Sequence, residues 1–263
     1  MGPADGGLVA AAGLLAGAVN AVAGGGTLIA FPALLTTGMP ALTANITSSV
    51  GLVTGYAGGA LGYQRELAGQ ATRLRALAIP ALLGGLTGAV VLVVTPAGAF
   101  RAVVGYLVVA ACGLLGAQPW LARLVAGRRA AASAARPTTS GVTTSDVTWP
   151  TRAGVFLAGV YGSYFGAGLG VLLLGVLGIL LPDDIQRTNA AKTLLSFGIN
   201  AIGVTVFVVS AQVSWAFAAI LLVMSYAGGV LGARLARVLP AAALRGTVVT
   251  LGLIVAVVLI VSR

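Results

Sequence analysis

Polar side chains able to hold a small ligand interrupt the apolar stretches of this sequence. Burying an unpaired polar group is costly, so these residues indicate pairing with one another or with a ligand. Lys192 is the only lysine and lies just inside an apolar run. We expect it either to bind a substrate or to extend its amine to the membrane surface. The other candidate binding residues are Asn20, Asn45, Thr47, Ser48, Asn189 and Asn200.

Two glycine tracts lie in corresponding places and predict breaks in membrane helices. The first contains Gly24, Gly25 and Gly26, and the second contains Gly166 and Gly168. Non-helical backbone at membrane depth persists only where protein or a water-filled cavity surrounds it. The half-helices that follow, beginning near Thr27 and Val171, would direct N–H groups and positive dipole ends at an anion. The alternative is that the glycines only permit close helix packing.

Two tyrosines flank the second glycine tract. Tyr161 and Tyr164 are predicted to close a substrate cavity, with packing or anchoring at the membrane interface as the alternative. Asn200 follows Asn189 by about three helical turns, so both side chains can face the same way. These residues complete the predicted substrate-binding set.

The positions of the acidic residues argue against a cation site or a proton relay within the membrane. Asp5, Glu66, Asp146, Asp183 and Asp184 all map to termini or loops, and there is no histidine. No carboxylate is therefore expected at membrane depth to bind a cation or relay protons. We predict no metal site, no cofactor and no enzyme active site, because no nucleophile–base pair is present. The arginines lie in loops between apolar runs, which argues against nucleic-acid binding despite a net charge of +10.

The composition identifies the solvent that must surround these elements. Hydrophobic residues make up 59% of the chain and charged residues 8%, whereas soluble domains are about a quarter charged. A spanning helix needs about 20 apolar residues, and the uncharged runs contain about eight such segments. The sequence predicts an all-α polytopic membrane protein in contact with the lipid bilayer.

The sequence also contains an internal repeat. Asn45 pairs with Asn189 at an offset of about 144 residues, and Ala99-Phe-Arg101 pairs with Ala243-Leu-Arg245. We predict a first membrane repeat over 1–119 and a second over 153–263. The polar segment 120–152 between them holds five arginines and is predicted to be a cytoplasmic linker. The Gly-xxx-Gly pairs at 84/88 and 228/232 are interpreted as helix-packing positions.

The arginine distribution favours one topology over another. If the first segment of each repeat is a glycine-broken re-entrant hairpin followed by three transmembrane helices, Arg234 and Arg237 lie inside and the uncharged 210–212 turn lies outside. The two repeats are then inverted. The alternative is eight full spans, which would place those arginines outside.

Several of these stretches resemble the sulfite exporter TauE/SafE family of membrane permeases. They are Ala16-Gly-Ala-Val-Asn-Ala-Val-Ala-Gly-Gly-Gly-Thr27, Ala44-Asn-Ile-Thr-Ser-Ser-Val50, Tyr161-Gly-Ser-Tyr-Phe-Gly-Ala-Gly-Leu-Gly170, Asn189-Ala-Ala-Lys192 and Gly228-Gly-Val-Leu-Gly-Ala-Arg-Leu235. The resemblance implies transport of sulfite, organosulfonates such as sulfoacetate, or related sulfur oxyanions. Many members carry lysine after the first-repeat asparagine, where this chain has Ile46.

These observations predict a permease or exporter of a small anion in a bacterial inner membrane. A transporter of an unrelated small solute and a non-transporting membrane scaffold subunit are the alternatives. Glycine-broken segments in both halves argue against the scaffold, because a scaffold needs no broken helix. Assembly into a homo-oligomer is left open by the sequence.

Overall fold

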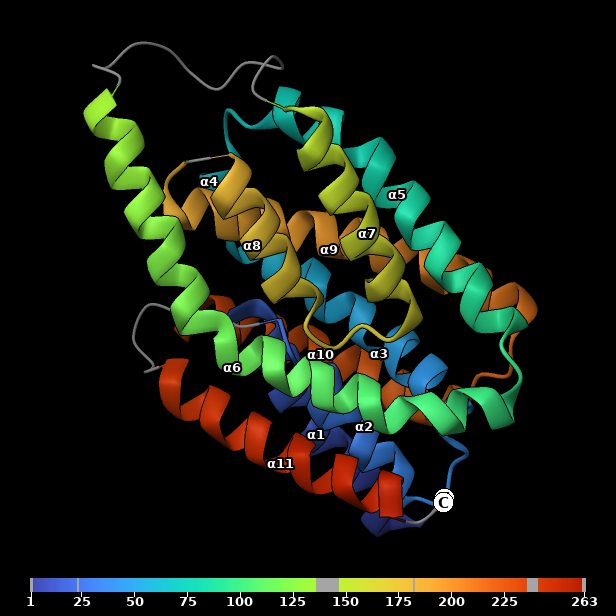
Figure 1. Cartoon of the computed structure of the whole chain (residues 1–263). Helices are drawn as coiled ribbons and strands as arrows, with labels where there is room; N and C mark the ends of the chain where they lie inside the picture. Colours follow the sequence, from blue (N-terminus) through green and yellow to red (C-terminus); the bar gives the residue numbers. More distant parts are fainter. Residues whose placement is uncertain (1, 23, 136–146, 182, 236–240, 262–263) are drawn as a thin grey trace.

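The computed structural model describes residues 2–22, 24–135, 147–181, 183–235 and 241–261, and its described secondary structure is helical (Figure 1). In chain order the helices are α1 (Pro3–Val22), α2 (Thr27–Thr36), α3 (Ala41–Gly62), α4 (Gln64–Leu67), α5 (Ala71–Val94), α6 (Ala97–Ala135), α7 (Trp149–Tyr164), α8 (Leu169–Leu180), α9 (Ile185–Ser210), α10 (Trp215–Leu235) and α11 (Ala241–Val261). Helix α6 continues well into the segment expected to be a linker, and residues 136–146 of that segment lie outside the described part.

Five of the described helices are long and apolar enough to cross a membrane. They lie within α1, α5, α6, α9 and α10, whereas α2, α8 and the 246–261 part of α11 are shorter apolar helices. Helix α3 is also 22 residues long, although its first half carries several polar side chains. An all-α polytopic membrane protein is thereby confirmed.

The helices of the two halves pack in matching pairs. Helix α1 lies along α10 and α7 lies along α5, each pair running in the same direction. Helix α3 packs on α10 as α9 packs on α5, and α2 contacts α11 as α8 contacts α6. Each of these contacts joins one half of the chain to the other half. The two halves therefore interlock rather than forming separate bundles.

Glycines allow the closest of these contacts. A Cβ at Gly228 would collide with the carbonyl of Leu14, and a Cβ at Gly84 would collide with that of Phe156. Gly232 meets Ala18 and Gly88 meets Val160 in the same manner, one turn further along. The packing interpretation of both Gly-xxx-Gly pairs agrees with this arrangement, because only a residue without a side chain lets two backbones approach so closely.

Helices α6 and α11 lie side by side in opposite directions (Figure 1). Gly105 packs against Ile260, whereas Cys112, further along α6, reaches back to Val249 and Gly252 of α11. Figure 1 shows α6 changing direction along its length, and Pro119 lies inside it. Proline removes a helical hydrogen bond and is a common cause of such bends.

The chain reverses direction at both glycine tracts. A Cβ at Gly26, just before α2, would meet Ala16 and Asn20 of α1, so α2 runs back beside the helix that precedes it. Helices α7 and α8 are related in the same way, with Gly162 packed against Leu169. With ten residues in α2 and twelve in α8, each returning helix is shorter than the roughly 17–25 residues of a full span.

One end of the molecule is closed by charged groups, and we call it the ion-pair end. Arg73 at the start of α5 is 2% exposed, and its Nη1 lies 2.7 Å from Oδ2 of Asp183 in the α8–α9 connection. Arg73 also donates to the carbonyl of Leu181, and Arg187 Nε lies 3.3 Å from the same carboxylate oxygen. Burial opposes ionisation of Asp183, but the Asp184 N–H and these two arginines hold its pKa below the usual value.

Candidate functional site

The two glycine breaks meet each other in the interior. The N–H of Gly168 donates to the carbonyl of Gly24 over 3.2 Å. A Cβ at Gly24 would lie 2.5 Å from Cα of Gly170, and a Cβ at Gly166 would lie 3.1 Å from Oγ1 of Thr27. The structure therefore brings together the two tracts that the sequence marks as candidate binding elements.

Each break is shaped by different residues. In the first, Gly24 has φ +80° and the Asn20 side chain accepts a 2.7 Å hydrogen bond from the N–H of Gly26. In the second, Gly166 and Gly168 have φ of +83° and +85°, a region that residues with a Cβ rarely occupy. Gly168 is the N-terminal cap of α8.

The ends of the half-helices are largely bonded within the protein. The N–H of Gly26 is bonded to Asn20 and that of Gly168 to Gly24. Gly25 packs against Leu115 of α6, and Phe31 of α2 meets Phe165 of the second break edge to face at 5.8 Å. The N–H groups of Gly26 and Gly168, at the starts of α2 and α8, are therefore bonded within the protein.

Several predicted residues of α3 hold the fold together. Asn45 donates from Nδ2 to the carbonyl of Tyr164 over 3.0 Å, which ties α3 to the end of α7. Thr47 accepts from the N–H of Ser214 in the α9–α10 turn, and Ser48 donates to the carbonyl of Asn45. The ring of Tyr164 packs near that of Phe100 at 6.0 Å. These contacts give the polar residues of α3 a structural role.

Lys192 is placed differently. It lies on α9, is 1% exposed, and its Nζ has no hydrogen-bond partner among the described residues. Extension of the amine to the membrane surface, the alternative reading of this lysine, does not agree with that burial. Its neighbour Thr193 packs at the Cβ position of Gly59 on α3, where Ala21 of α1 also approaches. Lys192 thus belongs to the region where α1, α3 and α9 meet.

Other buried polar atoms also have no partner among the described residues. They include Asn20 Nδ2, Asn45 Oδ1 and the hydroxyl of Tyr161, all in the predicted set. Asn200 donates to the carbonyl of Ser196 in its own helix, and Asn189 is partly exposed. The predicted residues therefore separate into some that bond to backbone and some that retain an unused polar atom.

Two residues with unused hydroxyls were missed by sequence reasoning. Tyr56 is 3% exposed and Ser196 is 1% exposed, and neither hydroxyl has a partner in the described part of the chain. The helical period could have found both, since Ser196 follows Lys192 by one turn and Tyr56 follows Asn45 by about three turns. Serine is common where membrane helices pack and tyrosine is common at the membrane interface, so neither residue type by itself indicated a ligand.

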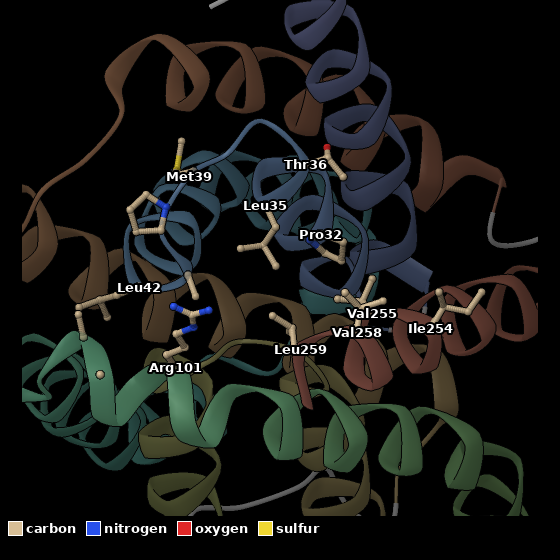
Figure 2. A pocket seen from close by; sticks show the side chains of 14 residues that line it. Pro32, Leu35, Thr36, Met39, Leu42, Arg101, Ile254, Val255, Val258 and Leu259 are labelled. Atoms are coloured by element: carbon tan, nitrogen blue, oxygen red, sulfur yellow. The ribbon is translucent and has the colours of Figure 1, made fainter. Parts of the chain in front are cut away.

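A pocket of about 720 Å³ lies at the opposite end from the ion pairs, and we call this the pocket end. Residues from α2, the start of α3, the start of α6 and the end of α11 line it. Figure 2 shows Arg101 of α6 at this pocket, with Pro32 and Leu35 of α2 and Val258 of α11 around it. None of the residues predicted as binding lines this pocket.

Comparison with known proteins gives consistent results. The chain is 24% identical over 225 residues to the Sinorhizobium sp. protein named "Probable membrane transporter protein ORF9", a match that covers 86% of this chain and 80% of that protein. It is 25% identical over 230 residues to a Haemophilus influenzae protein named "Probable membrane transporter protein", covering 85% and 82%. No solved structure matches. The sequence pattern described as Sulfite exporter TauE/SafE matches residues 9–259. This chain is a multi-pass membrane protein that belongs to the TauE/SafE family of membrane transporters.

Proposed function

We propose that this chain transports a small sulfur-containing anion, such as sulfite or an organosulfonate, across the bacterial inner membrane. The observation that carries the proposal is Lys192, whose amine is buried and has no hydrogen-bond partner among the described residues. A buried ammonium group needs a compensating negative charge. A bound anion supplies that charge.

The distribution of acidic residues supports this assignment. The chain has five acidic residues. Asp183 is bound to Arg73 and Arg187, Asp184 is exposed at the start of α9, and Glu66 lies in α4 at the same end. Asp5 lies in the first turn of α1, and Asp146 lies outside the described residues. Among the described residues Lys192 forms no ion pair with a carboxylate, which favours an anionic substrate over a cation.

The proposed architecture is a pair of inverted repeats, each with a re-entrant hairpin and three transmembrane helices. The reversal of the chain at each glycine break, the matched helix pairs and the opposite directions of α6 and α11 support it. So does the short length of α2 and α8. Transporters built this way bind substrate near the membrane midplane, between discontinuous helices.

The proposed orientation places the ion-pair end in the cytoplasm. Arg65, Arg73 and Arg187 gather there, and the loop excess of arginine marks the cytoplasmic side. In a Cys112→Ser background, a thiol reagent that cannot cross the membrane should label Ser210→Cys from outside and Arg65→Cys only after the cells are opened. Labelling in the reverse order would contradict this orientation.

The transport proposal is tested with purified protein in liposomes. We expect uptake of ³⁵S-labelled sulfite driven by its gradient, and at least a tenfold loss of flux in Lys192→Ala, because a buried charged partner is worth several kcal/mol when its counterpart is present. The matched control is Thr205→Ala on the same helix, which is exposed and bonds only its own helix. Wild-type protein that passes no sulfite, sulfoacetate or methanesulfonate, or equal flux in Lys192→Ala, would remove the proposal.

A further inference from the structure

The unused polar atoms around Lys192 differ in kind from those around Ser48, the equivalent position of the first half. On α1, α3 and α9, the helices that meet beside Lys192, three of them are Nδ2 of Asn20, the hydroxyl of Tyr56 and Oγ of Ser196. Asn20 uses its Oδ1 to accept from Gly26, which leaves its amide as a hydrogen-bond donor. The lysine amine donates only, and both hydroxyls are able to donate. This set contains four donors and no group restricted to accepting.

Helix contacts and helix direction put these groups in one region. Gly59 of α3 meets Thr193 of α9 and Ala21 of α1, at 3.1 and 3.6 Å from the glycine's Cβ position. Asn20 and Lys192 are the chain neighbours of Ala21 and Thr193. The three helices are therefore in contact at the height of this donor set.

Helices α3 and α9 run in opposite directions, which puts Tyr56 and Ser196 at the same height along the two helices. Arg187, near the start of α9, bonds to Ala68, which follows the end of α3. At the other end, Ser214, after α9, bonds to Thr47 near the start of α3. Moving one turn from Gly59 to Tyr56 along α3 thus corresponds to moving one turn from Thr193 to Ser196 along α9.

The corresponding place in the first half has other chemistry. Ser48 stands where the second half has Lys192, and its hydroxyl already donates to the carbonyl of Asn45. Asn45 uses its Nδ2 on Tyr164, so the atom left over is the acceptor Oδ1. That place has no cation and retains an acceptor, which would repel the oxygens of an anion. Of these two positions, only the one around Lys192 has the composition of an oxyanion site.

We propose that Tyr56 and Ser196, which join Asn20 and Lys192, are substrate-binding residues of a single site for the three-oxygen sulfur head group, –SO₃⁻, shared by sulfite and sulfonates. Each oxygen of that group accepts from the surrounding N–H and O–H donors, and the ammonium group of Lys192 neutralises the charge. This inference rests on the proposed function and adds the residues that select an oxyanion over a spherical ion such as chloride.

The test measures binding and transport separately. Binding is followed in detergent as the rise in melting temperature caused by sodium methanesulfonate, compared with sodium chloride at equal ionic strength. We expect wild-type protein to be stabilised by methanesulfonate, and Tyr56→Phe and Ser196→Ala each to weaken its apparent affinity about tenfold, the value of one hydrogen bond to a charged group. Ser196→Thr, which keeps the hydroxyl, should retain most of the affinity.

Transport gives a second readout that a packing defect would not produce. In liposomes, Tyr56→Phe and Ser196→Ala should raise the KM for ³⁵S-sulfite about tenfold with little change in maximal rate. The matched controls are Tyr226→Phe, exposed on α10, and Thr205→Ala, exposed on α9, and both should keep the wild-type KM.

The two proposals fail in different ways. Flux that depends on Lys192 but has the same KM in Tyr56→Phe and Ser196→Ala would overturn this inference and leave the transport function standing. Binding of methanesulfonate that depends on Tyr56 and Ser196, without any flux, would keep the site and overturn transport. Equal stabilisation by chloride and methanesulfonate would overturn the oxyanion site directly.

Discussion

In the first half the break between α1 and α2 combines the positive φ of Gly24 with a side-chain bond, because Asn20 accepts from the N–H of Gly26. In the second half the break between α7 and α8 is fixed by backbone, because Gly166 and Gly168 both adopt positive φ. The connections that follow also differ. The turn before α9 carries Asp183 bound to Arg73, whereas the turn before α3 borders the pocket through Met39 and Pro40.

Packing positions are shared between the halves, and polar positions are not. Small residues at 84 and 228 meet backbone carbonyls in the same geometry, because close approach of two helices has one solution: the absence of a side chain. At one pair of equivalent positions the second half has Lys192 and the first half has Ser48, so the chemistry of the two positions differs. The single-anion site proposed above needs only one cationic position, and Lys192 of the second half supplies it.

The largest expected effect comes from the ion-pair end. Asp183→Asn leaves Arg73 buried without its carboxylate, and breaking a buried pair costs about 3–5 kcal/mol of unfolding free energy. The comparison is Thr47→Val at the pocket end, which removes one neutral hydrogen bond to Ser214 and should cost about 1 kcal/mol. Denaturant unfolding of both variants in detergent measures the difference, and equal losses would show that the ion pair contributes no more than a neutral bond.

The same carboxylate gives a pH dependence with a defined sign. The pKa of Asp183 lies below its usual value in the folded protein, so the stability it contributes is complete above its unfolded pKa of about 3.9. That contribution is lost as the pH falls from about 4 through the folded pKa. Wild-type protein should therefore lose melting temperature below pH 4 more steeply than Asp183→Asn does. Parallel curves would mean that other groups account for the acid sensitivity.

The next prediction tests the close helix packing that the two halves share. Gly84→Ala and Gly228→Ala each introduce a Cβ against a carbonyl of the neighbouring helix, and overpacking of this kind costs about 1–3 kcal/mol. The two losses should be equal within error, because the contacts correspond. Gly113→Ala on α6 is the control, since a Cβ there meets nothing within 4 Å, and it should be neutral or slightly stabilising. A large inequality between Gly84→Ala and Gly228→Ala would break the equivalence of the halves.

The sequence predicted the features that depend on composition and on steric necessity. The membrane helices follow from hydropathy, the breaks at Gly24 and Gly168 from glycine tracts, and the tight contacts at Gly84 and Gly228 from their spacing. It did not predict the pairing of α1 with α10 or of α5 with α7, because apolar helices in lipid have no polar face that identifies a partner.

The sequence identified the buried polar residues as a group, but it did not show which of them bond to the protein backbone and which are free to bind a ligand. Asn45 and Thr47 bond to backbone at distant points of the chain, at Tyr164 and Ser214, and their type alone does not distinguish such a bond from a ligand contact. Arg73 and Asp183 were assigned to loops, and their pairing depends on tertiary contact between elements far apart in sequence. The burial of Lys192 likewise required the neighbouring α1 and α3 to be in place.

The last predictions, with effects no larger than those of the Gly84 and Gly228 variants, compare the bond of Asn20 in the first break with the backbone conformation of Gly168 in the second. Asn20→Ala leaves the N–H of Gly26 unbonded in a buried position, which costs about 1–3 kcal/mol. Gly168→Ala forces a residue with a Cβ into the left-handed region, which costs about 1–2 kcal/mol. Gly168→Asn should cost less, because asparagine tolerates that conformation, although Leu114 lies 3.3 Å from the Cβ position and leaves little space.

Hydrogen exchange locates each effect within the fold. Loss of Asn20 should increase exchange at the start of α2, and substitution of Gly168 should increase it at the start of α8, because each residue fixes its own break. Since Gly168 also donates to Gly24, some of its effect should reach the first break, whereas the side-chain bond of Asn20 goes to Gly26 within its own break. If Asn20→Ala loosens both breaks equally, the crossing of the two tracts is one cooperative unit, and the distinction between the bond of Asn20 and the backbone conformation of Gly168 does not describe its energetics.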